Sequence, residues 1–273
     1  MIAFPNAKIN LGLHILNRRT DGFHNIESVL FPIGLSDRLE LIEAPDGKYA
    51  FSSSGIQIPS DGKPNLCEQA FWLMHQEFRI PQVHLHLHKV VPAGSGLGGG
   101  SADAAFTLKM LNEKFSLGLN SSDLELLAAQ LGSDCPFFIR NEPMLATGRG
   151  EILQPISLSL KGLHLLLIRP RLHISTAKAY AGVKPAQPAS SVAEILAQPL
   201  HTWKNELKND FEESLFSKHP LLGKIKTKLY SQGAIYAAMS GSGSAIFGLF
   251  EKKPAENLKQ AFHDSFIWHE ELN

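Results

Sequence analysis

The chain has 273 residues, 44% of them hydrophobic, which is enough for one large domain or two ordinary domains with apolar cores. Lysine plus arginine equals aspartate plus glutamate, at 26 each, so no net charge attracts the chain to nucleic acid or to an anionic membrane. Two cysteines, Cys67 and Cys135, argue against a disulfide scaffold and suit the reducing cytoplasm. No apolar run is long enough to span a bilayer, and the first residues lack the features of a signal peptide. Composition predicts a cytoplasmic globular protein that holds any anionic ligand by local groups.

Residues 7–16 alternate in the manner of a β-strand, which places Lys8 and Asn10 on one face. That face is either an ordinary solvated surface or part of a site. A strong turn signal follows at Asp21-Gly22, with Phe23 and His24 at its exit. The aromatic ring is either a platform on which a base stacks or a member of the core. Residues 36–44 predict a further strand, so the chain begins as a β-meander.

Residues 67–78 predict a helix, introduced by Pro64-Asn65-Leu66. The strand that begins at Val83 carries leucines on one face and three histidines, His84, His86 and His88, on the other. Histidines at this spacing can chelate zinc, but no third type of ligand clusters nearby. A polar strand face is therefore the expected structure, with a metal site as the alternative.

Five glycines follow this strand within seven residues, between Gly94 and Gly100, and Ser101 is then predicted to cap a helix. Bare N–H groups that lead into a helix N-terminus attract anions, so the segment predicts a phosphate-binding loop. The P-loop pattern is absent, because no Lys-Ser or Lys-Thr pair follows the last glycine. The dinucleotide-binding pattern is formally present, but another helix follows where that fold needs a strand. A flexible linker is the remaining alternative.

A capping box at Ser122 and Glu125 predicts the next helix, which ends at Gly132. Asp134 follows immediately and is predicted to lie between that helix and an apolar strand. The residue is either part of a turn or a carboxylate at the rim of a pocket, and the spacing leaves both open.

The second half of the chain predicts a mixture of strands and helices. Strands are expected at 162–170, 234–239, 244–250 and 266–272, the last at a sheet edge, and helices after Ser175, within 191–232 and from Pro254. A second glycine loop, residues 240–244, joins two of the strands. This order is typical of an α+β layer of ferredoxin-like character, and the pattern changes near residue 155, which predicts two α+β domains.

Three segments, 7–28, 92–105 and 239–250, in this order and spacing, resemble the three motifs of the GHMP small-molecule kinases. The resemblance implies an α+β, two-domain fold: a nucleotide-binding domain over 1–155, a ferredoxin-like domain over 156–273, and an active site in the cleft between them. It also implies ATP-dependent phosphorylation of a hydroxyl group with Mg²⁺, on a small molecule rather than nucleic acid or membrane, by a monomer or weak homodimer.

Within the family, the first segment is similar to that of the kinases that act on a cytidylyl methylerythritol on the route to isoprenoid precursors. Another kinase of the family, such as one acting on homoserine, is the alternative, and a non-catalytic nucleotide sensor is a third reading that intact Lys8 and Asp134 oppose.

The resemblance assigns roles to individual residues. Asp134 matches the catalytic aspartate and Lys8 its partner, while Ser101 is the first candidate for a Mg²⁺ ligand. The positions matched to ATP binding are Asn65, Lys89, Pro92, Ala93, Gly94, Ser95, Gly96, Leu97, Gly98, Gly99, Gly100, Ser101 and Ala102. The positions matched to the substrate are Asn10, Phe23, His24, Thr176 and Tyr180. Relatives often have tyrosine at position 23, so Phe23 keeps the face for stacking and loses a hydroxyl.

Overall fold

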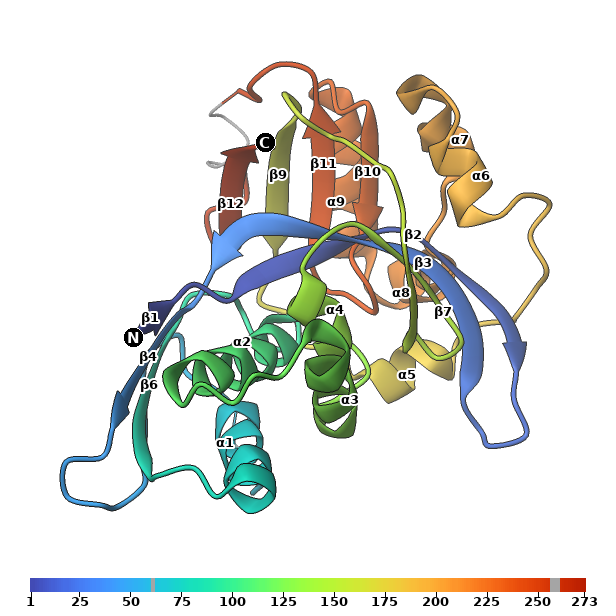
Figure 1. The fold of residues 1–273 in the computed structure, drawn as a ribbon. Helices are drawn as coiled ribbons and strands as arrows, with labels where there is room; N and C mark the ends of the chain where they lie inside the picture. Colours follow the sequence, from blue (N-terminus) through green and yellow to red (C-terminus); the bar gives the residue numbers. More distant parts are fainter. Residues whose placement is uncertain (60–61, 256–260) are drawn as a thin grey trace. The chain divides into compact units, whose positions relative to one another are not determined.

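The computed structural model describes residues 1–59, 62–255 and 261–273, and the chain separates into two compact units (Figure 1). Unit 1 consists of residues 1–8, 35–93 and 98–142, and unit 2 of residues 9–34, 94–97 and 143–273. Each unit is thus assembled from three separate stretches of chain. The predicted boundary of the family's domains at residue 155 stays a prediction. In the described part of the chain, no helix has the length and apolarity needed to cross a membrane.

Unit 1 contains a four-stranded sheet whose central strand carries the row of histidines. In spatial order its strands are β1 (Ile2–Ala3), β4 (Arg38–Glu43), β6 (Val83–Lys89) and β5 (Ala50–Gly55). The predicted alternation of β6 is confirmed, because Val83, Leu85 and Leu87 are buried while the histidines are half-buried. β4 pairs with β6 antiparallel and β5 pairs with it parallel. The parallel strand β5, rich in serine, was not predicted.

Four helices complete unit 1: α1 (Leu66–Phe78), α2 (Gly99–Lys114), α3 (Ser121–Leu131) and α4 (Cys135–Arg140). α2 packs against α1, α4 and β4. The predicted helix at 67–78 is confirmed, whereas the predicted capping box of α3 is wrong by two residues: Asn120 and Asp123 form it. The strand predicted after Asp134 is also wrong. A run of five apolar residues fits a buried helix as well as a buried strand, and Pro136 favours the first turn of a helix.

Unit 2 contains two antiparallel sheets. The first consists of β2 (Asn6–Arg18), β3 (His24–Ser36), β7 (Met144–Thr147) and β8 (Ile152–Pro155), in that order. The second has the order β10 (Tyr236–Met239), β11 (Ile246–Phe250), β9 (His164–Arg169) and β12 (Phe266–Glu271). The strands predicted in the second half, with the last at a sheet edge, are confirmed.

Helices of unit 2 lie mostly between β9 and β10 in the sequence. They are α5 (Thr176–Tyr180), α6 (Val192–Leu196), α7 (Trp203–Glu206), α8 (Phe211–Lys218) and α9 (Pro220–Ser231), with a short 3₁₀ helix at Leu200–Thr202. The predicted caps at Ser175 and Ser191 are confirmed. The helix predicted from Pro254 falls largely on residues 256–260, outside the described residues.

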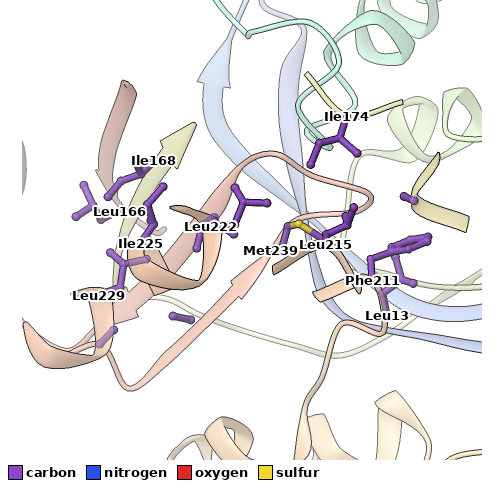
Figure 2. Packing of buried hydrophobic residues seen from close by; sticks show 14 of the residues in the cluster. Leu13, Leu166, Ile168, Ile174, Phe211, Leu215, Leu222, Ile225, Leu229 and Met239 are labelled. Atoms are coloured by element: carbon purple, nitrogen blue, oxygen red, sulfur yellow. The ribbon is translucent and has the colours of Figure 1, made fainter. Parts of the chain in front are cut away.

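The core of unit 2 joins its first strand to its last helices (Figure 2). Leu13 of β2 belongs to the same buried cluster as Phe211 and Leu215 of α8 and Leu222 of α9. α9 packs against β10 and β11. The cluster therefore fixes β2 through contacts with residues about 200 positions later in the chain, since the apolar area buried there is the main stabilising term.

Candidate active site

The glycine loop ends where α2 begins. Gly94, Gly96 and Gly98 have φ values of +60°, +80° and +72°, a region that side chains with a Cβ rarely enter. Gly98 is the N-cap of α2, and no side chain caps this helix end. The prediction that Ser101 is the cap is wrong: Ser101 lies in the first turn of α2. As the N-cap, Gly98 offers no side-chain acceptor to the first N–H groups of α2, which makes this end of the helix suited to an anion.

Lys8 and Asp134 form an ion pair in unit 1, with the ammonium nitrogen 3.8 Å from a carboxylate oxygen. The Lys8 side chain is 4% exposed and that of Asp134 is 41% exposed. Burial lowers the pKa of Lys8, against the attraction of Asp134, which raises it. Asp134 is the N-cap residue of α4, yet its carboxylate does not cap the helix. The pair therefore combines a fixed, buried cation with a carboxylate that solvent can reach.

Lys8 also lies beside the start of α2. A Cβ placed on Gly98 would lie 3.2 Å from Cγ of Lys8 and 2.8 Å from the Phe138 ring, so only glycine fits between them. The ordinary solvated strand face, one of the two alternatives for Lys8 and Asn10, is wrong, because both residues are buried.

Lys89 is held by two carboxylates and does not extend into solvent. Its ammonium nitrogen lies 2.5 Å from Asp37 and 2.6 Å from Asp103, and all three side chains are buried. Burial disfavours the charged amine, but the two carboxylates outweigh it and raise the pKa of Lys89. Burial also raises the pKa of Asp103 to about 8, against the attraction of Lys89. Lys89, predicted from the resemblance to lie near the nucleotide, therefore joins three parts of unit 1: β6, the residue before β4, and α2 at Asp103.

Asn65, which is also matched to the nucleotide, caps α1. Its side chain accepts a hydrogen bond of 2.8 Å from the backbone N–H of Cys67, and Glu68 completes the capping box. Such a cap contributes about 1 kcal/mol to helix stability. Pro92 and Ala93 lead directly into the loop, and Gly99, Gly100 and Ala102 lie in the first turn of α2.

Within unit 2, residues 94–97 pack on the second glycine loop. The hydroxyl of Ser240 donates to the carbonyl of Gly96 at 2.8 Å, and the N–H of Ala245 donates to the carbonyl of Ser95 at 3.1 Å. A Cβ on Gly96 would collide with the carbonyl of Ser240. The two glycine-rich segments therefore touch backbone to backbone.

Asn10 belongs to the same network of unit 2. Its amide donates to the hydroxyl of Ser28 at 2.8 Å, and its backbone N–H donates to the hydroxyl of Ser240 at 3.2 Å. These bonds connect β2 and β3 to the second glycine loop. Buried polar groups of this kind are stable only when they are hydrogen-bonded.

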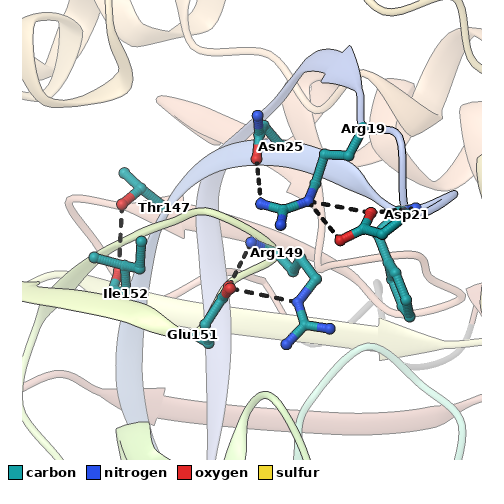
Figure 3. A network of polar contacts seen from close by, with 8 residues as sticks. Arg19, Asp21, Asn25, Thr147, Arg149, Glu151 and Ile152 are labelled. Carbon is teal, nitrogen blue, oxygen red and sulfur yellow. Dashed lines mark hydrogen bonds and ion pairs between the residues drawn. The ribbon is translucent and has the colours of Figure 1, made fainter.

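The turn at 19–25 carries Phe23 and His24 in unit 2, and its residues Arg19, Asp21 and Asn25 are labelled in Figure 3. The Phe23 side chain is 55% exposed, so the prediction of an exposed ring, one of two alternatives, is confirmed and the core alternative is wrong. The ring of His24 stacks on that of Tyr180, with centroids 5.0 Å apart. Burial, together with the nearby charge of Arg18, lowers the pKa of His24, so its imidazole is neutral at neutral pH and can both donate and accept. Thr176 lies one turn before Tyr180, and its hydroxyl is 3.2 Å from that of Ser242.

The histidines of β6 form a polar face, as expected. Both ring nitrogens of His86 are hydrogen-bonded to serines, to Ser52 at 2.8 Å and to Ser54 at 2.9 Å. Among residues 1–59, 62–255 and 261–273, no group of three or more histidine, cysteine or acidic residues could hold a metal ion.

Comparison with known proteins places these segments in one family. The family model "GHMP kinases N terminal domain" matches residues 65–142, and "GHMP kinases C terminal" matches residues 191–267. A 4-diphosphocytidyl-2-C-methyl-D-erythritol kinase of Bacteroides fragilis is 50% identical over 100% of both chains. The chain belongs to the GHMP kinase family.

Other GHMP kinases agree with this assignment at greater distance. A kinase of the same name from Cytophaga hutchinsonii is 47% identical over 97% of this chain and 96% of its own. The crystal structure of a 4-(cytidine 5'-diphospho)-2C-methyl-D-erythritol kinase has a TM-score of 0.82 and 30% identity over 98% of each chain. A homoserine kinase from Cytophaga hutchinsonii, 17% identical with a TM-score of 0.66, shares the fold. The α+β, two-domain GHMP kinase fold expected from the sequence is confirmed.

Several residues that build this GHMP kinase site were not singled out from the sequence. Asp37 and Asp103 give no local signal, because each is an ordinary acid in a strand or helix pattern and their partner is 52 and 14 positions away. Ser240 lay in a segment recognised as a glycine loop, and that signal would have sufficed to name it. Arg149, described below, stands between two glycines and reads as a simple turn residue.

Proposed function

We propose that the chain transfers the γ-phosphoryl group of ATP to 4-diphosphocytidyl-2-C-methyl-D-erythritol, giving its 2-phosphate in the methylerythritol phosphate pathway. The observation that supports phosphoryl transfer is the ion pair of Lys8 and Asp134, in which a buried ammonium lies 3.8 Å from a carboxylate that is exposed to solvent. The choice of substrate is supported by the names of relatives that are 50% identical over the whole chain, and by the exposed aromatic turn at Phe23 and His24. Homoserine is less well supported, because the homoserine kinase of similar fold is only 17% identical.

The residues at the start of α2 fit the phosphates of ATP. The uncapped N–H groups of the first turn and the dipole of the 16-residue helix both favour negative charge there. The glycines allow the backbone to approach a ligand closely, since a side chain at Gly98 would meet Phe138. Asn65 and Lys89 would act indirectly: Asn65 caps α1, which packs on α2, and Lys89 pairs with Asp103 of α2.

Magnesium, when bound, would neutralise part of the phosphate charge. Mg²⁺ commonly takes one or two protein ligands together with phosphate oxygens and water, so a preformed cluster of acids is not required. Ser101 is the ligand we propose, because it stands in the first turn of α2.

Asp134 would take the proton of the attacking hydroxyl. The oxygen of the acceptor forms a bond to the γ-phosphorus, the bond from that phosphorus to the bridging oxygen breaks, and ADP leaves. Phosphoryl transfer depends mainly on positioning and on neutralising charge, with little covalent help from the protein. Lys8 would supply charge: its ammonium is fixed by burial and stabilises negative charge that develops on the transferred group.

The cytosine of the substrate would be recognised by the aromatic residues of unit 2. Phe23 offers an exposed face for stacking, and neutral His24 can pair with both donors and acceptors on the edge of a base. The ring of Tyr180 stacks on that of His24 and so holds the imidazole in place. Thr176 and Asn10 belong to the same unit, and we propose that they help to position the substrate or the loops that contact it.

The test is an assay that couples ADP release to oxidation of NADH, with four acceptors and a control without acceptor. We expect turnover with the cytidylyl substrate and background rates with homoserine, mevalonate and galactose. Faster turnover with homoserine, or no ADP release with the cytidylyl substrate, would reject the proposed substrate. The Asp134→Asn variant serves as the control for ADP release that does not depend on this site.

A further inference from the structure

Arg149 covers the exposed ring of Phe23. Its guanidinium carbon lies 5.0 Å from the centroid of the ring, within the range of a cation–π contact. Arg149 stands between β7 and β8, in a tight turn formed with Gly148 and Gly150. The residue is thus brought to Phe23 by a segment distant in sequence from the turn that carries the ring. Figure 3 draws Arg149 together with Arg19 and Asp21 of that turn.

The guanidinium is held in this position by its own loop. Glu151 accepts a hydrogen bond from the backbone N–H of Arg149, and its carboxylate lies 3.3 Å from Nε. Among the described residues, no hydrogen bond is made by the two terminal nitrogens of the guanidinium. The loop is joined to β3 by a bond of 2.7 Å from the N–H of Ile26 to the carbonyl of Gly148.

The backbone of the Phe23 turn is also fixed. The backbone N–H of Phe23 donates to the carboxylate of Asp21 at 3.1 Å, and the carbonyl of Phe23 accepts from the N–H of Arg19 at 2.8 Å. Arg19 in turn contacts Asp21 and donates to Asn25 at 3.1 Å. Since the backbone is held at both ends, the orientation of the ring is the freedom that remains, and Arg149 restricts it.

We propose that Arg149 is a positioning residue for substrate recognition: it covers one face of Phe23 so that the other face is held ready for the cytosine. The inference rests on the proposed function. An exposed ring must lose rotational freedom when a base stacks on it, and this loss weakens binding. A ring that Arg149 already holds has less freedom to lose. Phe23 has no hydroxyl with which to anchor its own ring, so the contact with Arg149 is what restricts it.

The experiment is a double-mutant cycle measured by steady-state kinetics. Arg149→Met keeps length and removes the guanidinium, and we expect it to raise KM for the cytidylyl substrate about two- to fivefold, the equivalent of an exposed cation–π contact. Turnover and KM for ATP should not change. Arg149→Lys keeps the charge without the planar group and should give a smaller rise. Thermal melting of each variant checks that it is folded.

The background of Phe23→Ala separates this inference from the proposed function. Phe23→Ala alone should raise KM for the cytidylyl substrate roughly tenfold to a hundredfold. If Arg149 acts through the ring, Arg149→Met should add nothing further in this background. The same fold-change in both backgrounds, or none in either, overturns the positioning role. An unchanged KM in Phe23→Ala itself would instead reject the stacking of cytosine on this turn.

Arg140→Met is the matched control. Arg140 is exposed to the same extent, 39% against 40%, and is likewise paired with a glutamate, Glu125, but it covers no aromatic ring in the described part of the chain. KM for both substrates should remain at the wild-type value in this variant. A rise as large as that of Arg149→Met would show that the loss of any surface arginine produces the effect, and would overturn the inference.

Discussion

Lys89→Met should weaken unit 1 at the point where the phosphate loop meets α2. The ammonium of Lys89 lies within 2.6 Å of both Asp37 and Asp103, and none of the three side chains is more than 3% exposed. Lys89 is the cation that compensates these two buried acids, and burial raises the pKa of Asp103 to about 8. Removing the lysine leaves a buried carboxylate without its cation. Such losses cost about 3–5 kcal/mol, even though the N–H groups of Val90 and Val91 still donate to Asp37.

The stability that unit 1 loses in Lys89→Met should be smaller at low pH than at high pH. Without the attraction of Lys89, burial raises the pKa of Asp103 still further above its value in the unfolded chain, so the folded variant binds more protons than the unfolded one. Its stability must therefore rise as pH falls from 8 towards 5, and the difference from the wild type must shrink. At the low end of this range only the lost packing of the lysine chain should remain.

Hydrogen exchange measured by mass spectrometry suits this question, because peptides from β6 and α2 report the opening of unit 1 without requiring that the whole chain unfold in one step. Rates are corrected for intrinsic exchange at each pH. Lys48→Met, which removes the same groups from an exposed turn of unit 1, is the control and should change little. A loss below about 1 kcal/mol in the opening free energy, or a loss that is equal at pH 5 and pH 8, would refute this account of the triad.

Three further outcomes are expected. Asp134→Asn should lower kcat roughly 10²- to 10⁴-fold while ATP still binds, as measured by steady-state kinetics and calorimetry, and wild-type turnover would remove Asp134 from the proton transfer. Because burial lowers the pKa of Lys8, kcat should decline with rising pH before an ordinary lysine would lose its proton; Lys8→Arg should shift this decline to higher pH, and an identical profile would assign it to another group. Gly96→Ala should weaken ATP binding, because φ is +80° and the new Cβ would meet the carbonyl of Ser240; Gly118→Ala, at φ +72° in open space, should leave ATP affinity intact, and equal effects would point to general strain.

Local signals predicted the elements well, and long-range contacts account for what was missed. The alternation of β6 and the asparagine that begins α1 are visible in a few neighbouring residues. α4 was predicted as a strand because five buried residues in succession satisfy either structure, and only packing against α2 and α3 decides between them. Ser101 was predicted as a cap because serine is a common N-cap, whereas the positive φ of Gly98 starts the helix three residues earlier.

The candidate site shows the same division. Lys8 and Asp134 were found by resemblance to the motifs, and 126 positions separate the two residues of this ion pair. Asn10 was assigned to the substrate by the same resemblance, but its hydrogen bonds to Ser28 and Ser240 depend on how β3 and the second glycine loop pack. No pattern along the chain reports such contacts. The resemblance could name positions, and only the fold could give their partners.

The assembly of unit 2 from distant segments bears on how the chain matures during synthesis. Leu13 is translated near the beginning, yet the cluster that buries it includes Phe211 and Leu222. A ribosome that adds roughly 5–20 residues per second needs about 10–40 seconds to cover that distance, and β2 has no complete core to enter in the meantime. All residues of unit 1 have been synthesised once residue 142 is added, so unit 1 can fold first. The earliest apolar strand of the protein is therefore among the last to be buried, which exposes the nascent chain to aggregation for longer than a chain refolding from its full length.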